Sequence, residues 1–304
     1  MQGRINKTKS VANEIAQICK ETELLKICLR YVKLLLNLCL DSTEKYGCAL
    51  WDLSRSKKSV DDLNKMKPNV LKRVLQLPSS TPSDALQYDF GINDLSLDIM
   101  MEKIVLAVET WNNDDDRVAK QLFQSLMKKK VDCFCTEVLD VCRIFNVSFD
   151  EMLEERDVRK KLKSIVIRIQ EQELYKRMLI SSKMDGALMN GFCYDGKVKR
   201  YLLELDFAEA RVIFMMRYRM LPTKANFPGR WSGTECNICK FEDTDEHIFH
   251  CPGYQDLISD DVNHKMFWNE EILNDTVKMK KGACVLLGIV ERLLEVQDMK
   301  DVDE

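Results

Sequence analysis

This chain of 304 residues has few of the residues that interrupt helices, since it contains 6 prolines and 11 glycines. With 45% hydrophobic residues, it is also too apolar to be intrinsically disordered. Such a composition is typical of a mostly helical globular protein. Histidine is scarcer still: there are 3, and all of them lie between positions 247 and 264. The first four fifths of the chain therefore contain no histidine that could act as a general base.

Two common catalytic signatures are absent from the sequence. There is neither a glycine-rich phosphate loop nor a G-x-S-x-G turn, which excludes the usual nucleotide-hydrolysing and serine-hydrolase patterns. Asp61 and Asp62 superficially match the paired aspartates with which polymerases hold two metal ions. A polymerase needs those carboxylates on a hairpin between hydrophobic strands, whereas here we expect them to open a helix. We therefore expect no catalysis from this chain.

Long uncharged hydrophobic runs are also missing. The strongest apolar stretch, residues 24–40, is interrupted by Lys26, Arg30 and Lys33, and a membrane span would tolerate those charges poorly. The first residues, MQGRINKTKS, are polar and do not form a signal peptide, and the chain has 12 cysteines. We expect no membrane partner and a reducing compartment, the nucleus or the cytosol.

What the sequence does contain is a compact set of metal-binding residue types near its C-terminus. Cys236, Cys239, His247 and Cys251 follow the spacing C-x2-C-x7-H-x3-C, which is typical of a zinc knuckle. Four nitrogen and sulfur ligands leave no open position for water, so we predict a structural Zn²⁺ site. One alternative is that these are ordinary buried thiols. Another is that His250 replaces His247, although His250 adjoins Cys251 and is more easily understood as a solvated neighbour.

Apolar periodicity predicts a mainly α fold, with a multi-helix region, a helical linker region and the small zinc knuckle. The expected regions are 1–111, 112–225, 226–262 (the knuckle) and 263–304 (a helical tail). Within them we expect helices over residues 9–40 (one or two), 60–77, 95–111, 117–145, 149–184, 197–220 and 278–299.

The expected helix 197–220 carries the strongest local charge. Between residues 197 and 230 there are eight cationic side chains and three carboxylates, a surplus of five positive charges. That surplus predicts contact with the phosphates of RNA or DNA, and Tyr218 between two arginines could stack on a base. The alternative is a helix that packs Tyr218 inward and leaves both arginines in water. The candidate nucleic-acid-binding residues are Arg200, Arg211, Arg217, Tyr218, Arg219, Lys224 and Arg230.

The knuckle itself is acidic. Around the single Lys240 it carries Glu235, Glu242, Asp243, Asp245 and Glu246. Phosphates would be repelled by that cluster, so we expect the knuckle to brace the basic helix rather than to bind nucleic acid. The formal charge of -3 for the whole chain and its long amphipathic helices also suit a protein partner.

Several segments together resemble one family, the reverse transcriptases of non-LTR (LINE-like) retrotransposons, in the part that follows their polymerase palm. Residues 46–51, YGCALW, are similar to the family's YGxExW segment. Residues 63–82, LNKMKPNVLKRVLQLPSSTP, resemble its LxxxQxxxLRxxLxLPxxTP helix. Residues 86–97 resemble the alternation of small and apolar residues that follows this helix and ends in a GxxxL turn. CNICKFEDTDEHIFHCPGY is similar to its zinc-binding module, with a spacer between His247 and Cys251 that is one residue shorter.

The resemblance implies a thumb-like helical region and a C-terminal zinc module, parts that in the family hold template and primer. It also implies that Arg211, Arg217 and Arg219 lie where the family carries arginines ahead of that module. The chain begins where the family's palm has ended, so polymerase activity does not carry over. We expect a non-catalytic nucleic-acid-binding remnant or domesticated derivative. The alternatives are a protein-interaction scaffold and the C-terminal fragment of a full RNA-directed DNA polymerase.

Overall fold

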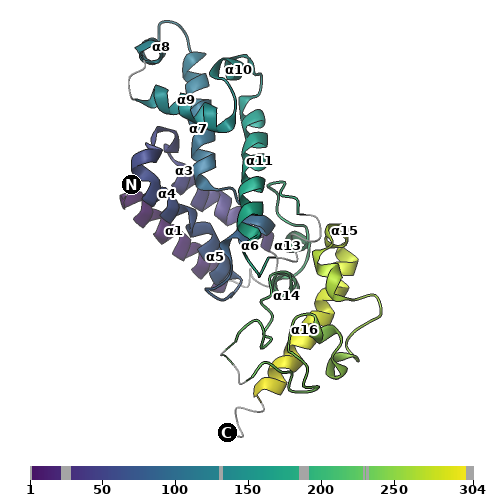
Figure 1. The fold of residues 1–304 in the computed structure, drawn as a ribbon. Coiled ribbons are helices and arrows are strands. Elements are labelled where there is room, and N and C mark those ends of the chain that lie inside the picture. The colour runs from purple at the N-terminus through teal and green to yellow at the C-terminus, as the bar shows by residue number, and fades with distance from the viewer. Residues whose placement is uncertain are drawn as a thin grey trace.

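The structure is a computed structural model that describes residues 2–21, 29–129, 133–184, 192–228, 230 and 233–298. Over these ranges the chain is built from helices and turns, with a single isolated antiparallel bridge between Glu235 and Glu242 (Figure 1). The predicted mainly α fold is confirmed. Residues 299–304 of the expected C-terminal tail lie outside the described residues.

The helices of the first half follow one another closely. They are α1 (Gln2–Glu21), α2 (Leu29–Leu35), the π-helix η2 (Leu36–Asp41), α3 (Ser42–Lys45), the 3-10 helix η3 (Cys48–Leu50), α4 (Leu53–Asn64), α5 (Met66–Val74), α6 (Ser83–Phe90) and α7 (Leu95–Trp111). Helices α1 and α7 are the long ones among them.

The second half contains the longest helices as well as several single turns. They are α8 (Val118–Lys129), α9 (Phe134–Phe145), α10 (Phe149–Glu154), α11 (Val158–Met178), α13 (Tyr201–Glu204), α14 (Phe207–Arg217), α15 (Glu270–Leu273), α16 (Thr276–Asp298), and the 3-10 helices η4 (His247–Phe249), η5 (Pro252–Tyr254) and η6 (His264–Trp268).

Side-chain caps explain where many of these helices begin. The carboxylate of Asp94 accepts a hydrogen bond from the Ser96 backbone N–H at 2.8 Å, and Asn64 Oδ1 accepts one from the Leu95 N–H at 3.1 Å. Two of the four unpaired donors at the start of α7 are satisfied in this way. The predicted helix 95–111 therefore has the bounds that the structure gives to α7.

Several sequence expectations about helices are wrong. The helix expected over 149–184 is divided into α10 and α11, with residues 155–157 between them. The helix expected over 197–220 is broken into α13 and α14, because Asp206 caps α14 and Glu209 bonds back to it in a capping box. Asp61 and Asp62 were expected to open a helix, but they lie in the last turns of α4, which begins at Leu53. Their carboxylates therefore gain nothing from the helix dipole, which favours anions at the other end.

The apolar side chains form two buried clusters. The second cluster joins Leu97–Val108 of α7 to side chains of α8, α9, α10 and the first half of α11. The first cluster joins α1–α6 to α13, α14, the cysteine–histidine segment and α16. Helices α7 and α11 pack against each other and contribute to both clusters. Neither cluster ends at the predicted boundaries 111/112 and 225/226, and the division into four regions stays a prediction.

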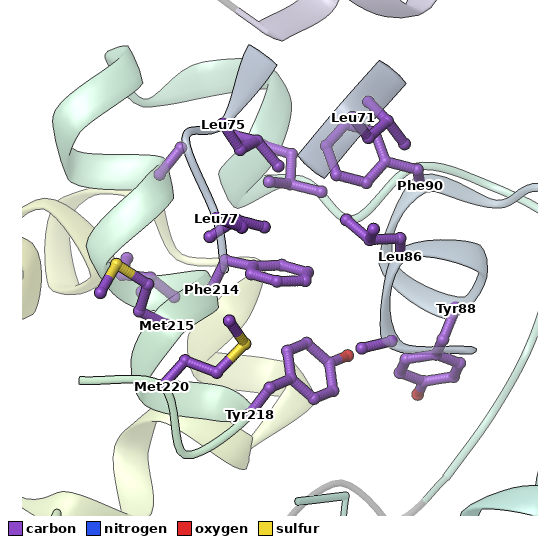
Figure 2. Packing of buried hydrophobic residues seen from close by; sticks show 14 of the residues in the cluster. Leu71, Leu75, Leu77, Leu86, Tyr88, Phe90, Phe214, Met215, Tyr218 and Met220 are labelled. Carbon is purple, nitrogen blue, oxygen red and sulfur yellow. The ribbon is translucent and has the colours of Figure 1, made fainter. Parts of the chain in front are cut away.

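Helix α14 is buried on nearly every side. Phe214 lies beside Leu77, which follows α5, and the ring of Tyr218 points toward the side of the cluster that holds Leu86 and Tyr88 of α6 (Figure 2). On another side α14 packs along α16, so it lies between the N-terminal helices and the C-terminal helix. The segment that precedes the cysteine–histidine cluster is therefore anchored in the core of the molecule.

Gly91 ends α6 in a conformation and a space that only glycine fits. Its φ is +56°, in the left-handed region, and a Cβ built on it would lie 2.5 Å from the carbonyl oxygen of Gly196. Both effects penalise any side chain, and the neighbour is backbone that cannot swing aside. Gly91 thus allows the loop before α13 to approach α6 closely.

We expect Gly91→Ala to lower the free energy of unfolding by about 2 to 3 kcal/mol. Gly3→Ala on α1 is the control, because nothing lies within 4 Å of its Cβ position. That variant should be unchanged or up to about 1 kcal/mol more stable. Denaturant unfolding of both proteins checks the prediction, and equal stability of the two variants would contradict the role given to Gly91.

Candidate metal centre

Cys236 and Cys239 lie on a tight turn. The Cys236 N–H donates to the Phe241 carbonyl at 2.6 Å, and the Lys240 N–H donates to the Cys236 carbonyl at 3.1 Å. Lys240 has a φ of +68°, which lets the chain reverse. The Ile238 N–H donates to Cys236 Sγ at 3.4 Å. The turn thus presents two sulfurs to one point.

His247 and Cys251 come from the next short turn. The Thr244 hydroxyl accepts a hydrogen bond from the N–H of His247, the first residue of the 3-10 helix η4, at 3.0 Å. The Cys251 N–H donates to the His247 carbonyl at 2.9 Å, so the two residues are one turn apart. His250 is exposed and is not part of the cluster, which favours His247 over His250 as the ligand.

The structure brings the four predicted ligand residues together. One ligand atom from each of Cys236, Cys239, His247 and Cys251 lies within 4.8 Å of the others. Cys251 Sγ is 3.8 Å from Cys236 Sγ and 3.7 Å from Cys239 Sγ. Thiolates at about 2.3 Å from a tetrahedral ion lie about 3.8 Å apart, so these spacings fit such an ion. The 3.1 Å between Cys239 Sγ and His247 Nε2 is about 0.5 Å shorter than an ion would impose.

Burial sets the protonation of the cluster. It raises the pKa of the Cys251 thiol to about 12, so a thiolate there needs a nearby cation. Burial also raises the pKa of Cys239, but hydrogen bonds from the Phe241 N–H and from the neighbouring thiols outweigh it and leave that pKa lowered. Burial lowers the pKa of His247, which keeps its imidazole neutral and able to bind a metal. The four residues could therefore hold a soft divalent cation.

Polar side chains around the cluster hold its two turns in place. Asp243 accepts a hydrogen bond from the Lys224 N–H at 2.9 Å, and Lys224 Nζ donates to Asn237 Oδ1 at 3.0 Å. Asp245 accepts from Asn226 Nδ2 at 2.8 Å, and burial raises the pKa of Asp245 to about 7. Two of the acidic residues expected on the knuckle surface are thus buried and hold the segment that precedes it.

Lys224 is a correction to the sequence interpretation. Its side chain was expected to contact nucleic acid, but the residue is buried and braces the turn that carries Cys236. Asn237 and Thr244 were missed as supporting residues. A signal for Thr244 was present, because it stands three residues before His247, the spacing of a helix cap. No comparable local pattern marks the contact between Lys224 and Asn237.

The cluster is joined to the rest of the molecule through apolar contacts and one ion pair. Phe249, which follows His247 on η4, packs against Phe267 with ring centroids 6.0 Å apart. Arg292 of α16 donates to the Gly253 carbonyl at 2.8 Å and forms a bidentate pair with Asp256. The segment after the last cysteine is therefore fixed to α16.

The structure buries Arg217 and Tyr218, the two residues on which the nucleic-acid prediction most depended. Arg217 is 1% exposed; its Nε and Nη2 donate to the Asp89 carboxylate at 3.2 and 3.1 Å, and its Nη1 donates to the Phe267 carbonyl at 2.8 Å. Tyr218 is fully buried. Contact with a phosphate or a base is therefore wrong for both residues. The alternative was a helix that packs Tyr218 inward and leaves both arginines in water. It is right for Tyr218 and wrong for Arg217, which is buried.

Arg211 and Arg200 have structural partners as well. The guanidinium of Arg211 donates to the carbonyls of Leu75 and Gln76, where α5 ends, and burial lowers its pKa. Arg211 therefore satisfies unpaired carbonyls at a helix C-terminus. Arg200 forms an ion pair with Glu204 and donates to the Asn274 carbonyl at 2.9 Å.

Arg219 and Arg230 are exposed, as is Arg200. Arg219 has a φ of +49° and borders a hollow of about 390 Å³ together with Asp245, Glu246 and His264. The carboxylates in that hollow do not favour an anionic ligand. The cations of the predicted basic helix therefore do not gather on one surface. They lie in the core, at helix ends and beside carboxylates.

Comparison with known proteins identifies no relative. No protein-family model, no curated protein and no solved structure matches the chain.

Proposed function

We propose that Cys236, Cys239, His247 and Cys251 hold a structural Zn²⁺ ion in a non-catalytic protein that binds nucleic acid. The observation that carries the proposal is the convergence of these four ligand atoms within 4.8 Å. Three thiolates and one imidazole suit zinc better than a hard cation such as Mg²⁺, which takes oxygen ligands. A complete four-ligand set leaves no position for a substrate or a reactive water.

Zinc would supply a crosslink between the two turns that carry its ligands. Cys236 and Cys239 belong to the first turn, and His247 and Cys251 to the second. Because the second turn is continuous with the core through Ile248 and Phe249, the ion would fix the first turn to the body of the protein. The role is mechanical and requires no chemistry at the metal.

The nucleic-acid part of the proposal is supported by two observations. One is the resemblance of four separate segments to the region that follows the palm in non-LTR reverse transcriptases. The other is a cation-lined groove on α1 and α5, whose geometry is given in the next subsection. We include in the proposal that the chain is a remnant or domesticated derivative of that region and that it acts in the nucleus or cytosol. The free state of all described cysteines is consistent with a reducing compartment.

No helix within the described ranges combines the length and the apolar character needed to cross a membrane.

The proposal is tested by two measurements on the purified full chain. Elemental analysis is expected to find about one zinc per chain, as a Cys3His site binds one ion. Fluorescence anisotropy with a labelled single strand of RNA or DNA is expected to show micromolar or tighter binding that weakens steeply with salt. A zinc-free folded protein would refute the metal site, and the absence of binding at micromolar concentration would refute the nucleic-acid function.

A protein-interaction scaffold is the second candidate, and one surface favours it. Tyr31, Leu34 and Leu38 lie on one side of α2 and η2 at helical spacing and are 46%, 50% and 62% exposed. Exposed apolar stripes of this kind are more common at protein interfaces than on free surfaces. A partner recovered after nuclease treatment, and lost with Leu34→Asp/Leu38→Asp, would favour the scaffold.

A further inference from the structure

A groove runs between the first helix and the fifth. Helices α1 and α5 pack against each other, as Figure 1 shows, and two hollows of about 480 and 800 Å³ lie along this contact. Both hollows are bordered by Asn13 of α1 and Arg73 of α5, whose side chains are joined by a hydrogen bond of 2.6 Å. Since they share these residues, the two hollows lie next to each other, and we call the pair the groove.

Cations line the groove from both walls. Lys9 and Lys20 come from α1, and Lys72 and Arg73 come from α5. None of the described residues that border either hollow is acidic. Among the described residues, no carboxylate forms an ion pair with any of these four cations. Burial alone lowers the pKa of Lys72, whose ammonium group has only the Ser79 carbonyl to donate to, at 3.2 Å.

The helical register of α1 explains this segregation of charge. Lys9, Asn13, Ala16 and Lys20 are spaced by four, three and four residues, which places them on one stripe. Glu14 lies five residues after Lys9, about 140° around the helix, and its carboxylate accepts a hydrogen bond from Ser10 instead. The wall of the groove is therefore cationic, although the chain as a whole has a charge of -3.

We propose that this groove, lined by Lys9, Lys20, Lys72 and Arg73, binds the sugar–phosphate backbone of a nucleic-acid strand. This inference rests on the proposed nucleic-acid function and assigns it a site that differs from the helix predicted from the sequence. The amides of Asn13 and Asn69 border the same groove and can donate to phosphate or sugar oxygens.

Shape favours a strand over other polyanions. Lys9 and Lys20 are separated by about 17 Å along α1, a length that holds about five phosphates at the rise of a stacked strand. A lipid surface is flat and would contact the exposed Lys9, Lys20 and Arg73 without entering the hollows, whereas a single strand can lie along them. None of the described residues that border the groove has an aromatic ring on which a base could stack. We therefore expect the groove to recognise the sugar–phosphate backbone and to bind strands of any base sequence.

The test compares two charge-neutral pairs with a matched control. Lys9→Gln/Lys20→Gln and Lys72→Gln/Arg73→Gln each remove two charges from one wall of the groove. Lys57→Gln/Lys58→Gln removes two charges from exposed positions on α4 that do not border it. Binding of a labelled single strand of about 12 nucleotides to the full chain is measured by anisotropy between about 50 and 200 mM salt.

Each groove variant is expected to bind about tenfold or more weakly and to lower the slope of log affinity against log salt by about 1.4. The control pair should change the slope by less than half of that value, about 0.7. Circular dichroism and thermal unfolding verify that the variants fold, since Lys9, Lys20 and Arg73 are exposed.

Two different results would overturn the assignment. If the unaltered protein binds the strand with a steep salt dependence but both groove variants behave as the control does, the groove is wrong and the proposed function stands. If the unaltered protein binds no strand, the proposed function itself fails. Groove-dependent binding of anionic vesicles or of an acidic peptide without strand binding would show another occupant and would equally contradict the inference.

Discussion

Removing the metal ion is expected to release the turn that carries Cys236 and Cys239 while the helical body stays folded. In finger peptides zinc binding contributes about 10 to 16 kcal/mol of apparent free energy, far more than a short segment gains from its own contacts. Without the ion, the first turn is held mainly by Lys224, Asp243 and Asn237. We expect chelation to raise protease cleavage between residues 233 and 246 about 100-fold, which corresponds to a loss of about 2.7 kcal/mol of local stability.

A matched pair of cysteine variants separates the metal effect from the loss of a thiol. Cys236→Ser should reproduce the effect of chelation without a chelator. Cys284→Ser, at an exposed free thiol of α16, should leave metal content and cleavage unchanged. Cleavage can be mapped by mass spectrometry of the fragments. Equal protection of residues 233–246 with and without the ion would mean that the cluster does not need a metal to fold.

Acid should release the ion, because protons compete with a metal for its ligands. Cys251 has a raised pKa and His247 a lowered one, both through burial. Metal binding must therefore displace a proton from the Cys251 thiol, whereas the imidazole of His247 is already neutral at pH 7. Affinity is expected to fall as the pH decreases, which a zinc indicator dye can follow.

Arg217→Ala is expected to lower the free energy of unfolding by about 3 to 5 kcal/mol. The variant would leave the Asp89 carboxylate, which is fully buried, without its cation and with only the Tyr201 hydroxyl as a described donor, at 2.5 Å. An unpaired buried charge of this kind is far more costly than the pair is favourable. Because Arg217 also donates to the Phe267 carbonyl, its loss would loosen η6 from α14.

Two further variants decide whether this loss arises from the buried pair. Arg219→Gln, two residues along and exposed, should change stability by no more than about 0.5 kcal/mol. Asp89→Leu/Arg217→Met removes both charges and should regain a large part of the loss. Denaturant unfolding measures all three. If Arg217→Ala lowered nucleic-acid affinity while stability stayed unchanged, the buried structural role would be contradicted and the original prediction restored.

The metal cluster could be predicted from sequence because its ligands are local. All four residues fall within 16 positions, and the turns that carry them are set by short-range hydrogen bonds. Helix α7 was predicted equally well, since Asp94 marks its start and a continuous apolar pattern fills it. The break between α13 and α14 also had a local signal, the Asp206 and Glu209 capping box, which the long apolar pattern concealed.

The role of Arg217 could not be read in the same way. Its partner Asp89 is 128 positions away, and nothing near either residue indicates the pairing. Because charged residues are usually exposed, a cluster of arginines in the sequence predicts a basic surface. The groove was missed for the converse reason: its four cations come from two helices about 50 residues apart, and only the contact of α1 with α5 assembles them.

X-ray absorption at the zinc edge of the purified full chain tests the central claim most directly. The account predicts one tetrahedral zinc with three sulfur neighbours at about 2.3 Å and one nitrogen at about 2.0 to 2.1 Å. Cys236→Ser should remove this signature, and His250→Gln should preserve it, because the ligand is His247. A protein without zinc, or a site of oxygen and nitrogen neighbours only, would contradict the account.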